Sequence, residues 1–266
     1  MTSTISKGTS EAIAVTHVGS VAAVIISRPS QRNCMTLAMW RSMARQFEEL
    51  GCDPDVRAII LTGAGGDFSA GADISEFAAV RADARQNAEY QAAVDACSDA
   101  VEAVAKPVIA AIKGYCLGGA CHLALACDFR FAESTAQIGI PGARLSIVAG
   151  VRSTQRLLAL AGLSNAKRLL FSGERVDAAE ALSMGLIDAE IDDALGSALS
   201  FAEDIACNAP LSIAGAKAIL NGLSMGAGAL DPGAAQRLID DACTSADYAE
   251  GQRAFAEKRR PIFRGA

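Results

Sequence analysis

Runs of apolar residues along the chain alternate with segments of helical periodicity, which predicts an α/β protein. Two short apolar runs flank the turn pair Gly19-Ser20 and predict a β-hairpin over 13–18 and 21–27. A helical pattern then begins at Thr36, a favourable N-cap residue, and extends to residue 50. Further strands are predicted at 56–62, 107–112 and 129–132, with a short last strand at 185–188.

The rest of the chain has a mostly helical pattern. The polar, Ala-rich segment 75–105 predicts one or two helices, and another helix begins at Gly119. No repeat in the sequence supports a solenoid. A Gly/Ala/Ser-rich connection at 222–233 precedes two final helices. The remaining helices are predicted over 152–161, 164–171, 177–184, 195–208 and 210–223.

Two glycine-rich junctions carry the candidate chemistry. Segment 63–74 follows one predicted strand, and segment 113–119 leads from another strand through Gly118 and Gly119 into a helix. Glycine lets a backbone approach a ligand closely, and the first N–H groups of a helix have no intrahelical acceptor. Together the two junctions could offer two N–H donors to one carbonyl oxygen, the geometry that stabilises an enolate or a tetrahedral oxyanion.

Composition narrows the class of protein. A chain of 266 residues, of which 51% are hydrophobic, suits one domain or a domain with an appendage. The net charge of −6 gives no electrostatic reason to expect a nucleic-acid partner. Residues 1–11 are polar and lack an apolar signal core, and no run reaches membrane-spanning length, so no membrane partner is expected. These features favour a cytoplasmic protein.

The 8 cysteines form no Cys-x-x-Cys pair, which favours reduced and mostly buried thiols. Cys116, Cys121, His122 and Cys127 lie close together in the sequence, but their spacing does not fit a zinc site. We therefore interpret these cysteines as core residues and expect no metal site.

From about residue 21 to its end, the chain resembles the crotonase superfamily, the enoyl-CoA hydratase/isomerase proteins. The resemblance is carried by the sequences of three segments, 68–74, 114–119 and 154–157. Shorter matches are Arg28-Pro29 with Asn33, Ser172-Gly173, Gly185-Leu-Ile187 and Glu257-Lys-Arg259. The resemblance implies a spiral of ββα units over 1–200 and a helical C-terminal region over 201–266 that packs across subunits in trimers, often paired into hexamers.

The resemblance also implies the ligand and its binding residues. The ligand is an acyl-CoA thioester, so CoA enters as part of the substrate and no separate cofactor is expected. The N–H groups of Ala72 and Gly119 would form the oxyanion hole for the thioester oxygen. The implied substrate and CoA contacts are Arg28, Ala70, Asp73, Ile74, Gly118 and Lys258.

The chain departs from the family where hydration needs its acid and base. Typical hydratases have two glutamates, and the corresponding positions here are His122 and Gly142. Glycine can neither activate water nor protonate carbon. His122 lies one helical turn from Gly119, and its ordinary pKa near 6.5 suits proton transfer. It is therefore our candidate catalytic residue, and the alternative is a core histidine bonded to backbone.

Other titratable residues near the motifs are weaker candidates for a catalytic role than His122. Asp73 suits a role as acceptor for loop N–H groups, and Glu76 suits a solvated helix start. We interpret Arg144 and Arg152 as surface charges or ion-pair partners. His17 is far from the motifs in the sequence, and we expect it to be structural or exposed.

Three hypotheses about function follow. The first is an atypical family enzyme that stabilises a thioester enolate with help from His122. The second is a catalytically silent acyl-CoA-binding protein that kept the pocket. The third, a scaffold without a ligand, requires Ala72 and Gly119 to be blocked. A carboxylate near His122 would favour the enzyme, and a pocket without other titratable groups would favour the binding protein.

Overall fold

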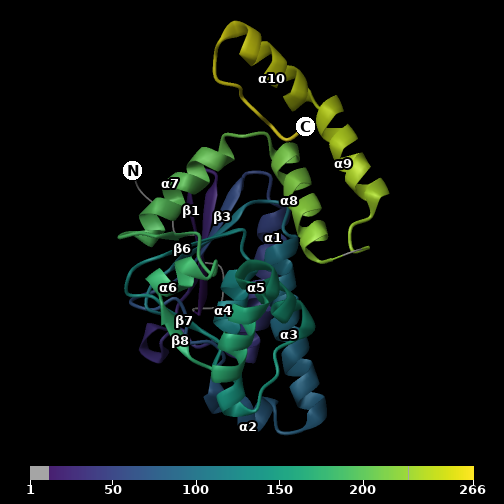
Figure 1. Cartoon of the computed structure of the whole chain (residues 1–266). Helices are drawn as coiled ribbons and strands as arrows, with labels where there is room; N and C mark the ends of the chain where they lie inside the picture. The colour runs from purple at the N-terminus through teal and green to yellow at the C-terminus, as the bar shows by residue number, and fades with distance from the viewer. Residues whose placement is uncertain (1–11, 227) are drawn as a thin grey trace.

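A six-stranded sheet forms the centre of the computed structural model, which describes residues 12–226 and 228–266 (Figure 1). The predicted absence of a signal core at 1–11 therefore lies outside the described residues. The strands, in their order across the sheet, are β1 (Ile13–Val18), β2 (Val21–Ile26), β3 (Ala58–Gly63), β4 (Val108–Ile112), β6 (Phe129–Ala132) and β9 (Ala189–Glu190). β1 and β2 form the predicted antiparallel hairpin, and all later neighbours pair in parallel.

A second sheet was not predicted, because its strands are very short. It contains β5 (Tyr115–Leu117), β7 (Gln137–Gly139) and β8 (Arg175–Asp177). Single parallel bridges between Ser69 and Cys116 and between Met35 and Ala72 continue the same stack. The chain thus adds β4 and β6 to the large sheet and β5 and β7 to the small one in turn, which is the spiral that the resemblance implies.

Helices cover both faces of the large sheet. On one face α1 (Leu37–Cys52), α3 (Ala84–Ala103), α4 (Gly119–Leu125) and α5 (Val151–Ser172) share a core with the inward side chains of the strands. On the other face, α7 (Ala194–Ala206) buries Ala194, Ala198 and Ala202 against alternate strand residues such as Ile60. This arrangement explains why the strands read as continuous apolar runs.

Local signals in the sequence set several helix ends. The Thr36 hydroxyl accepts a hydrogen bond from the Met39 N–H at 3.3 Å, which confirms the predicted N-cap of α1. α5 breaks at Gly162, where φ is 73°, so the two predicted helices are its two halves. Among the described helices, none is both long and apolar enough to cross a membrane.

The C-terminal helices extend beyond the sheet. Lys217 of α8 (Pro210–Ser224) is buried and donates hydrogen bonds to Asp128 Oδ2 at 2.7 Å and the Lys106 carbonyl oxygen at 3.0 Å. α9 (Pro232–Thr244) packs beside α8, and α10 (Ala246–Glu257) lies farther from the sheet (Figure 1). α7 spans residue 200, so the division of the chain at that point stays a prediction. The other helices are α2 (Phe77–Val80) and α6 (Ala178–Ser183).

Two predictions from the sequence were wrong. Residues 185–188 are not a strand, because Gly185 has a φ of 77° and the Leu186 N–H closes the end of α6 on the Ala181 carbonyl oxygen. The thiols are not mostly buried, because only four of the eight cysteines are buried and Cys34 is half-buried. The buried ones are Cys97, Cys116, Cys121 and Cys127, and the exposed ones are Cys52, Cys207 and Cys243.

Candidate active site

The two glycine-rich junctions lie against each other. Phe68 and Ser69 donate their N–H groups to the carbonyl oxygens of Lys113 and Tyr115, both at 2.7 Å. Leu117 returns a hydrogen bond to the Ser69 carbonyl oxygen at 3.1 Å. A Cβ added at Gly71 would lie 3.5 Å from the Gly119 nitrogen and only 2.5 Å from the Leu117 carbonyl oxygen. The approach of these two backbones therefore depends on glycine at position 71.

Buried Asn33 holds the first junction in place. Its side-chain amide donates to the carbonyl oxygens of Ala64 at 2.8 Å and Asp67 at 2.6 Å. Its side-chain oxygen accepts the Arg28 N–H at 2.8 Å, and its backbone carbonyl accepts the Ser69 hydroxyl at 2.7 Å. The Arg28-Pro29 motif with Asn33 thus acts as a support for the loop.

The N–H group of Ala72 is the one in segment 68–73 without an acceptor among the described residues. Its neighbours all donate: Ala70 to the Arg32 carbonyl at 2.9 Å, Gly71 to the Ser69 hydroxyl at 3.0 Å and Asp73 to the Met35 carbonyl at 2.9 Å. Because the residue is half-buried, this N–H group is free to donate to water or to a ligand atom.

Gly119 offers the second N–H group. It is the first residue of α4, and its N–H has no acceptor within the part of the chain that the structure describes. Gly118 precedes it with a φ of 56° and donates its own N–H to the Gly139 carbonyl oxygen at 2.8 Å. A Cβ at Gly119 would lie 3.2 Å from the Trp40 ring, which explains why a glycine occupies this position.

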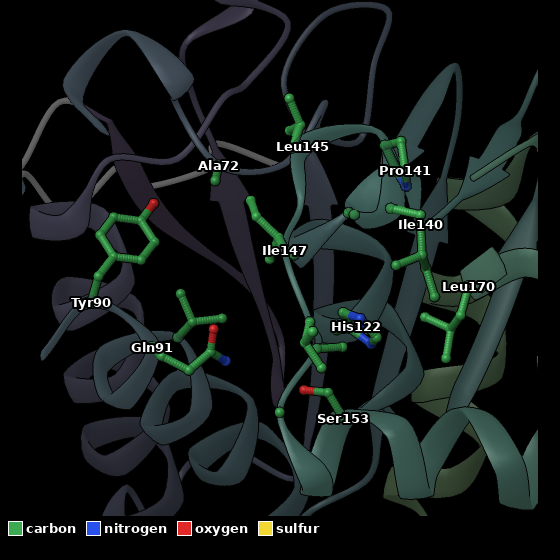
Figure 2. A pocket seen from close by; sticks show the side chains of 18 of the residues that line it. Ala72, Tyr90, Gln91, His122, Ile140, Pro141, Leu145, Ile147, Ser153 and Leu170 are labelled. Atoms are coloured by element: carbon green, nitrogen blue, oxygen red, sulfur yellow. The ribbon is translucent and has the colours of Figure 1, made fainter. Parts of the chain in front are cut away.

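Ala72 and Gly119 both line a cavity of about 500 Å³, and Figure 2 shows Ala72 in its wall. Six of the nine predicted site residues line it: Ala70, Ala72, Ile74, Gly118, Gly119 and His122. None of its described lining residues is an aspartate or a glutamate. Most of the wall is apolar, from Trp40, Phe77, Val94, Ile140, Leu145, Ile147, Val148, Leu170 and Phe171.

His122 lies in the wall of this cavity with 6% of its surface exposed. Neither ring nitrogen has a hydrogen-bond partner among residues 12–226 and 228–266, so the alternative of a histidine bonded to backbone does not hold. Burial, with a smaller contribution from the Arg156 charge, lowers the pKa of His122 from 6.5 to about 4. The ring is therefore neutral near pH 7 and a weaker base than an ordinary histidine.

The charge beside His122 belongs to a cluster that the sequence did not reveal. Arg156 is buried in α5 and donates to both Glu102 oxygens, at 3.1 and 2.8 Å, and to Asp99. Arg152 bonds the same two carboxylates, which confirms it as an ion-pair partner. The (i, i+4) spacing of the arginines and the (i, i+3) spacing of the acids could have indicated this pairing.

The three other predicted binding residues do not line the cavity. Arg28 donates to the Cys34 carbonyl oxygen at 2.8 Å and pairs with Asp73 at 2.9 Å. Asp73 also accepts the Ser75 N–H at 3.1 Å, as expected of a loop acceptor; its Ser75 bonds and Arg28 lower its pKa. Lys258 is exposed at the end of α10. Their contacts with CoA stay predictions.

The weaker candidates also lie outside the cavity. Glu76 is not a solvated residue, because it is half-buried and accepts the first N–H of α1, from Leu37, at 2.6 Å. Burial raises the pKa of this carboxyl. Arg144 and His17 are exposed.

Tyr90 and Gln91 of α3 and Ser153 of α5 line the cavity without having been predicted. Tyr90 accepts a hydrogen bond from Trp40 Nε1 at 3.1 Å, and burial raises the pKa of its phenol to about 12. Tyr90 belongs to a buried stripe on α3 with Val94, Cys97 and Val101. The three- and four-residue spacing of that stripe could have placed Tyr90 in the core.

Acidification is expected to destabilise the protein through His122. In the unfolded chain His122 binds a proton near pH 6.5, whereas in the folded protein it does so only near pH 4. The contribution of neutral His122 to the free energy of unfolding is therefore fully present above pH 6.5 and is lost as the pH falls towards 4. The full effect is on the order of 3 kcal/mol. Urea unfolding at about pH 7.5 and 4.5 should show a smaller loss for His122→Gln than for the wild type. If the wild type and His122→Gln lose the same free energy of unfolding on acidification, the low pKa of His122 is wrong.

Comparisons with known proteins agree with this fold. The family model for enoyl-CoA hydratase/isomerase matches residues 16–266. The chain is 34% identical to the short-chain-enoyl-CoA hydratase of Clostridium acetobutylicum, over 91% of this chain and 93% of that one. It is 33% identical to the 2,3-dehydroadipyl-CoA hydratase of Escherichia coli, over 90% and 93% of the two chains. A crystal structure of an enoyl-CoA hydratase/carnithine racemase from Magnetospirillum magneticum superposes with a TM-score of 0.91, at 33% identity and 97% coverage of both chains.

The chain therefore belongs to the enoyl-CoA hydratase/isomerase family and has the crotonase fold. Membership confirms the resemblance seen in the motifs.

Proposed function

We propose that the protein binds an acyl-CoA thioester and holds the thioester oxygen between the N–H groups of Ala72 and Gly119. One observation carries this proposal: the Ala72 N–H is unused in a segment whose other N–H groups all donate, and it borders the same cavity as Gly119. Two fixed donors in an apolar site stabilise the negative charge of an enolate. Each is worth about 3 kcal/mol in comparable enzymes.

Proton transfer in this site is proposed to depend on His122. A neutral imidazole can accept a proton, whereas the pKa of Tyr90, about 12, keeps that phenol protonated. The ordinary hydration mechanism with two glutamates is disfavoured, since no carboxylate lines the described cavity and Gly142 contributes no functional group. The protein is thus proposed to be an enzyme with non-standard catalytic residues.

The second candidate function is a catalytically silent acyl-CoA-binding protein. The lack of a carboxylate in the lining and the low pKa of His122 favour it. Turnover of any member of a panel of acyl-CoA thioesters would exclude this candidate, and tight binding without turnover would support it.

Calorimetry is expected to show that acyl-CoA binds and that the Gly119 N–H contributes. Gly119→Pro removes the N–H donor and adds a Cβ next to Trp40. Gly119→Ala adds the same Cβ but keeps the N–H donor, so it serves as the control. Proline is tolerated at the first position of a helix, so α4 should form in both variants. We expect the proline variant alone to lose about 3- to 10-fold in acyl-CoA affinity, the value of one hydrogen bond.

Absence of binding by every acyl-CoA ester would overturn the proposed function. Equal affinities of the proline and alanine variants would exclude the Gly119 donor while leaving binding itself intact.

A trimer or hexamer built through the C-terminal helices is also proposed. α9 packs beside α8, α10 lies farther from the sheet, and Phe255 of α10 (88%) and Ile262 beyond it (70%) are exposed. Because Lys258 lies at the end of α10, away from the cavity of its own chain, a contact between Lys258 and CoA phosphates would cross a subunit boundary. Light scattering at micromolar concentration should give the mass of three or six chains, and a monomer would refute the assembly.

A further inference from the structure

The cavity is much larger than a short acyl group requires. A methylene group occupies about the volume of one water molecule, ~30 Å³, so a four-carbon acyl group fills roughly 120 Å³. The cavity measures about 500 Å³. In the proposed complex the pantetheine end of CoA would take part of this space, and the rest would remain for the acyl group.

The cavity wall carries no carboxylate at Gly142, the position where a hydratase has one of its catalytic glutamates. At Gly142 a Cβ would lie 2.9 Å from the Ile147 carbonyl oxygen, so the turn leaves no room for a side chain. The Ile147 N–H closes this turn on the Gly142 carbonyl oxygen at 3.0 Å. The Ile147 side chain lies in the middle of the cavity in Figure 2. An apolar side chain thus faces the reacting end of the ligand.

The lining also offers little to a charged acyl group. Arg81 is its one charged residue within the described chain, and its guanidinium stacks on Phe77 at 4.7 Å and Tyr90 at 4.9 Å. The same guanidinium donates to Asn87 Oδ1 at 2.8 Å. Arg81 is therefore already engaged with groups of its own chain.

The apolar surface continues out of the cavity to the protein surface. Four large apolar residues line the cavity and are also exposed, which is unfavourable unless a ligand or partner covers them. We call them the rim: Ile74 (55%), Leu145 (48%), Val148 (90%) and Phe171 (74%). Because the rim residues also line the cavity, an acyl chain that fills the cavity would reach them.

We propose that the preferred ligand carries a long or bulky uncharged apolar acyl group, of about eight carbons or more, whose far end lies against the rim. This inference rests on the proposed function, because it assumes that the thioester oxygen binds at Ala72 and Gly119. Phe171 and Val148 are the residues that set chain-length preference, and neither belongs to the proposed oxyanion hole.

The test is a calorimetric series with saturated butanoyl-, octanoyl- and dodecanoyl-CoA, none of which has a double bond to hydrate. A fully buried methylene tightens binding about fourfold. We expect octanoyl-CoA to bind between about 10-fold and 10²-fold more tightly than butanoyl-CoA. Affinities equal within threefold across the series would overturn the inference, while failure of every ester to bind would overturn the proposed function itself.

Surface variants separate the rim from general effects on the fold. Phe171→Ser and Val148→Ser should each weaken dodecanoyl-CoA binding severalfold more than they weaken butanoyl-CoA binding. Leu163→Ser is the matched control for Phe171→Ser. Leu163 lies on α5, as Phe171 does, and is 60% exposed, but it does not line the cavity. If the rim variants change the oligomeric mass and not the chain-length preference, a second copy of the chain covers the rim and the inference is wrong.

Discussion

Crotonyl-CoA is expected to be hydrated at least about 10²-fold more slowly by this protein than by the short-chain-enoyl-CoA hydratase of C. acetobutylicum, its 34% identical relative. A positioned acid or base contributes about 10²–10⁴-fold, and neither His122 nor Gly142 provides a carboxylate. The loss of the conjugated enoyl absorbance measures the rate for both proteins under the same conditions. Comparable rates would mean that residues outside the proposed pair supply both the acid and the base.

Restoring both glutamates tests the same point from the opposite direction. His122→Glu with Gly142→Glu should increase hydration only if the backbone keeps its position. At Gly142 that condition fails, since the Ile147 carbonyl oxygen lies 2.9 Å from where the new Cβ would be. We therefore expect the 142–147 turn to shift in the double variant and hydration not to recover. A crystal structure of the double variant with an unmoved turn would contradict this reasoning.

His122→Ala is expected to lower the turnover of an identified acyl-CoA substrate by roughly 10²-fold and to change acyl-CoA affinity little. The substitution removes the imidazole and leaves the Ala72 and Gly119 N–H groups in place. His17→Ala is the control, because His17 is the other histidine of the chain and is exposed. Circular dichroism of both variants would show whether a loss of activity reflects unfolding.

The pH profile distinguishes a catalytic role of His122 from a structural one. A base with a pKa of about 4 remains unprotonated from pH 5 upwards, so the wild-type rate should decline only below that range. If turnover of the identified substrate is unchanged in His122→Ala, the histidine is structural. In that case we expect the catalytic residue in the loop after Gly71 or in the segment after Pro141.

Long elements with a strong period could be predicted from the sequence. α1, with Thr36 as its cap, and the continuous apolar strands β3 and β4 follow directly from local patterns. The small sheet could not be predicted this way, because β5 and β7 have three residues each and pair with segments distant in the chain. Strands of that length carry no measurable alternation.

The backbone part of the candidate site was more predictable than its side chains. Gly71 and Gly119 stand where a Cβ would meet neighbouring atoms, and so the sequence marks the positions of the two N–H groups. The pKa of His122 depends on burial and on Arg156, which comes from a different helix. No local pattern around position 122 contains that information.

The stacking of the spiral has a consequence for how such a site can diversify. Ala72 follows the segment bridged at Ser69, and Gly119 follows its bridge partner Cys116, so the pairing of two strand segments fixes where both N–H groups lie. Neighbouring strands are about 4.8 Å apart, whatever side chains they carry. The backbone, and not the side chains of the cavity wall, therefore sets the positions of the two N–H groups. Side chains of the cavity wall, including those at the two positions typical of glutamate, can therefore differ between proteins of this fold without moving the Ala72 and Gly119 N–H groups.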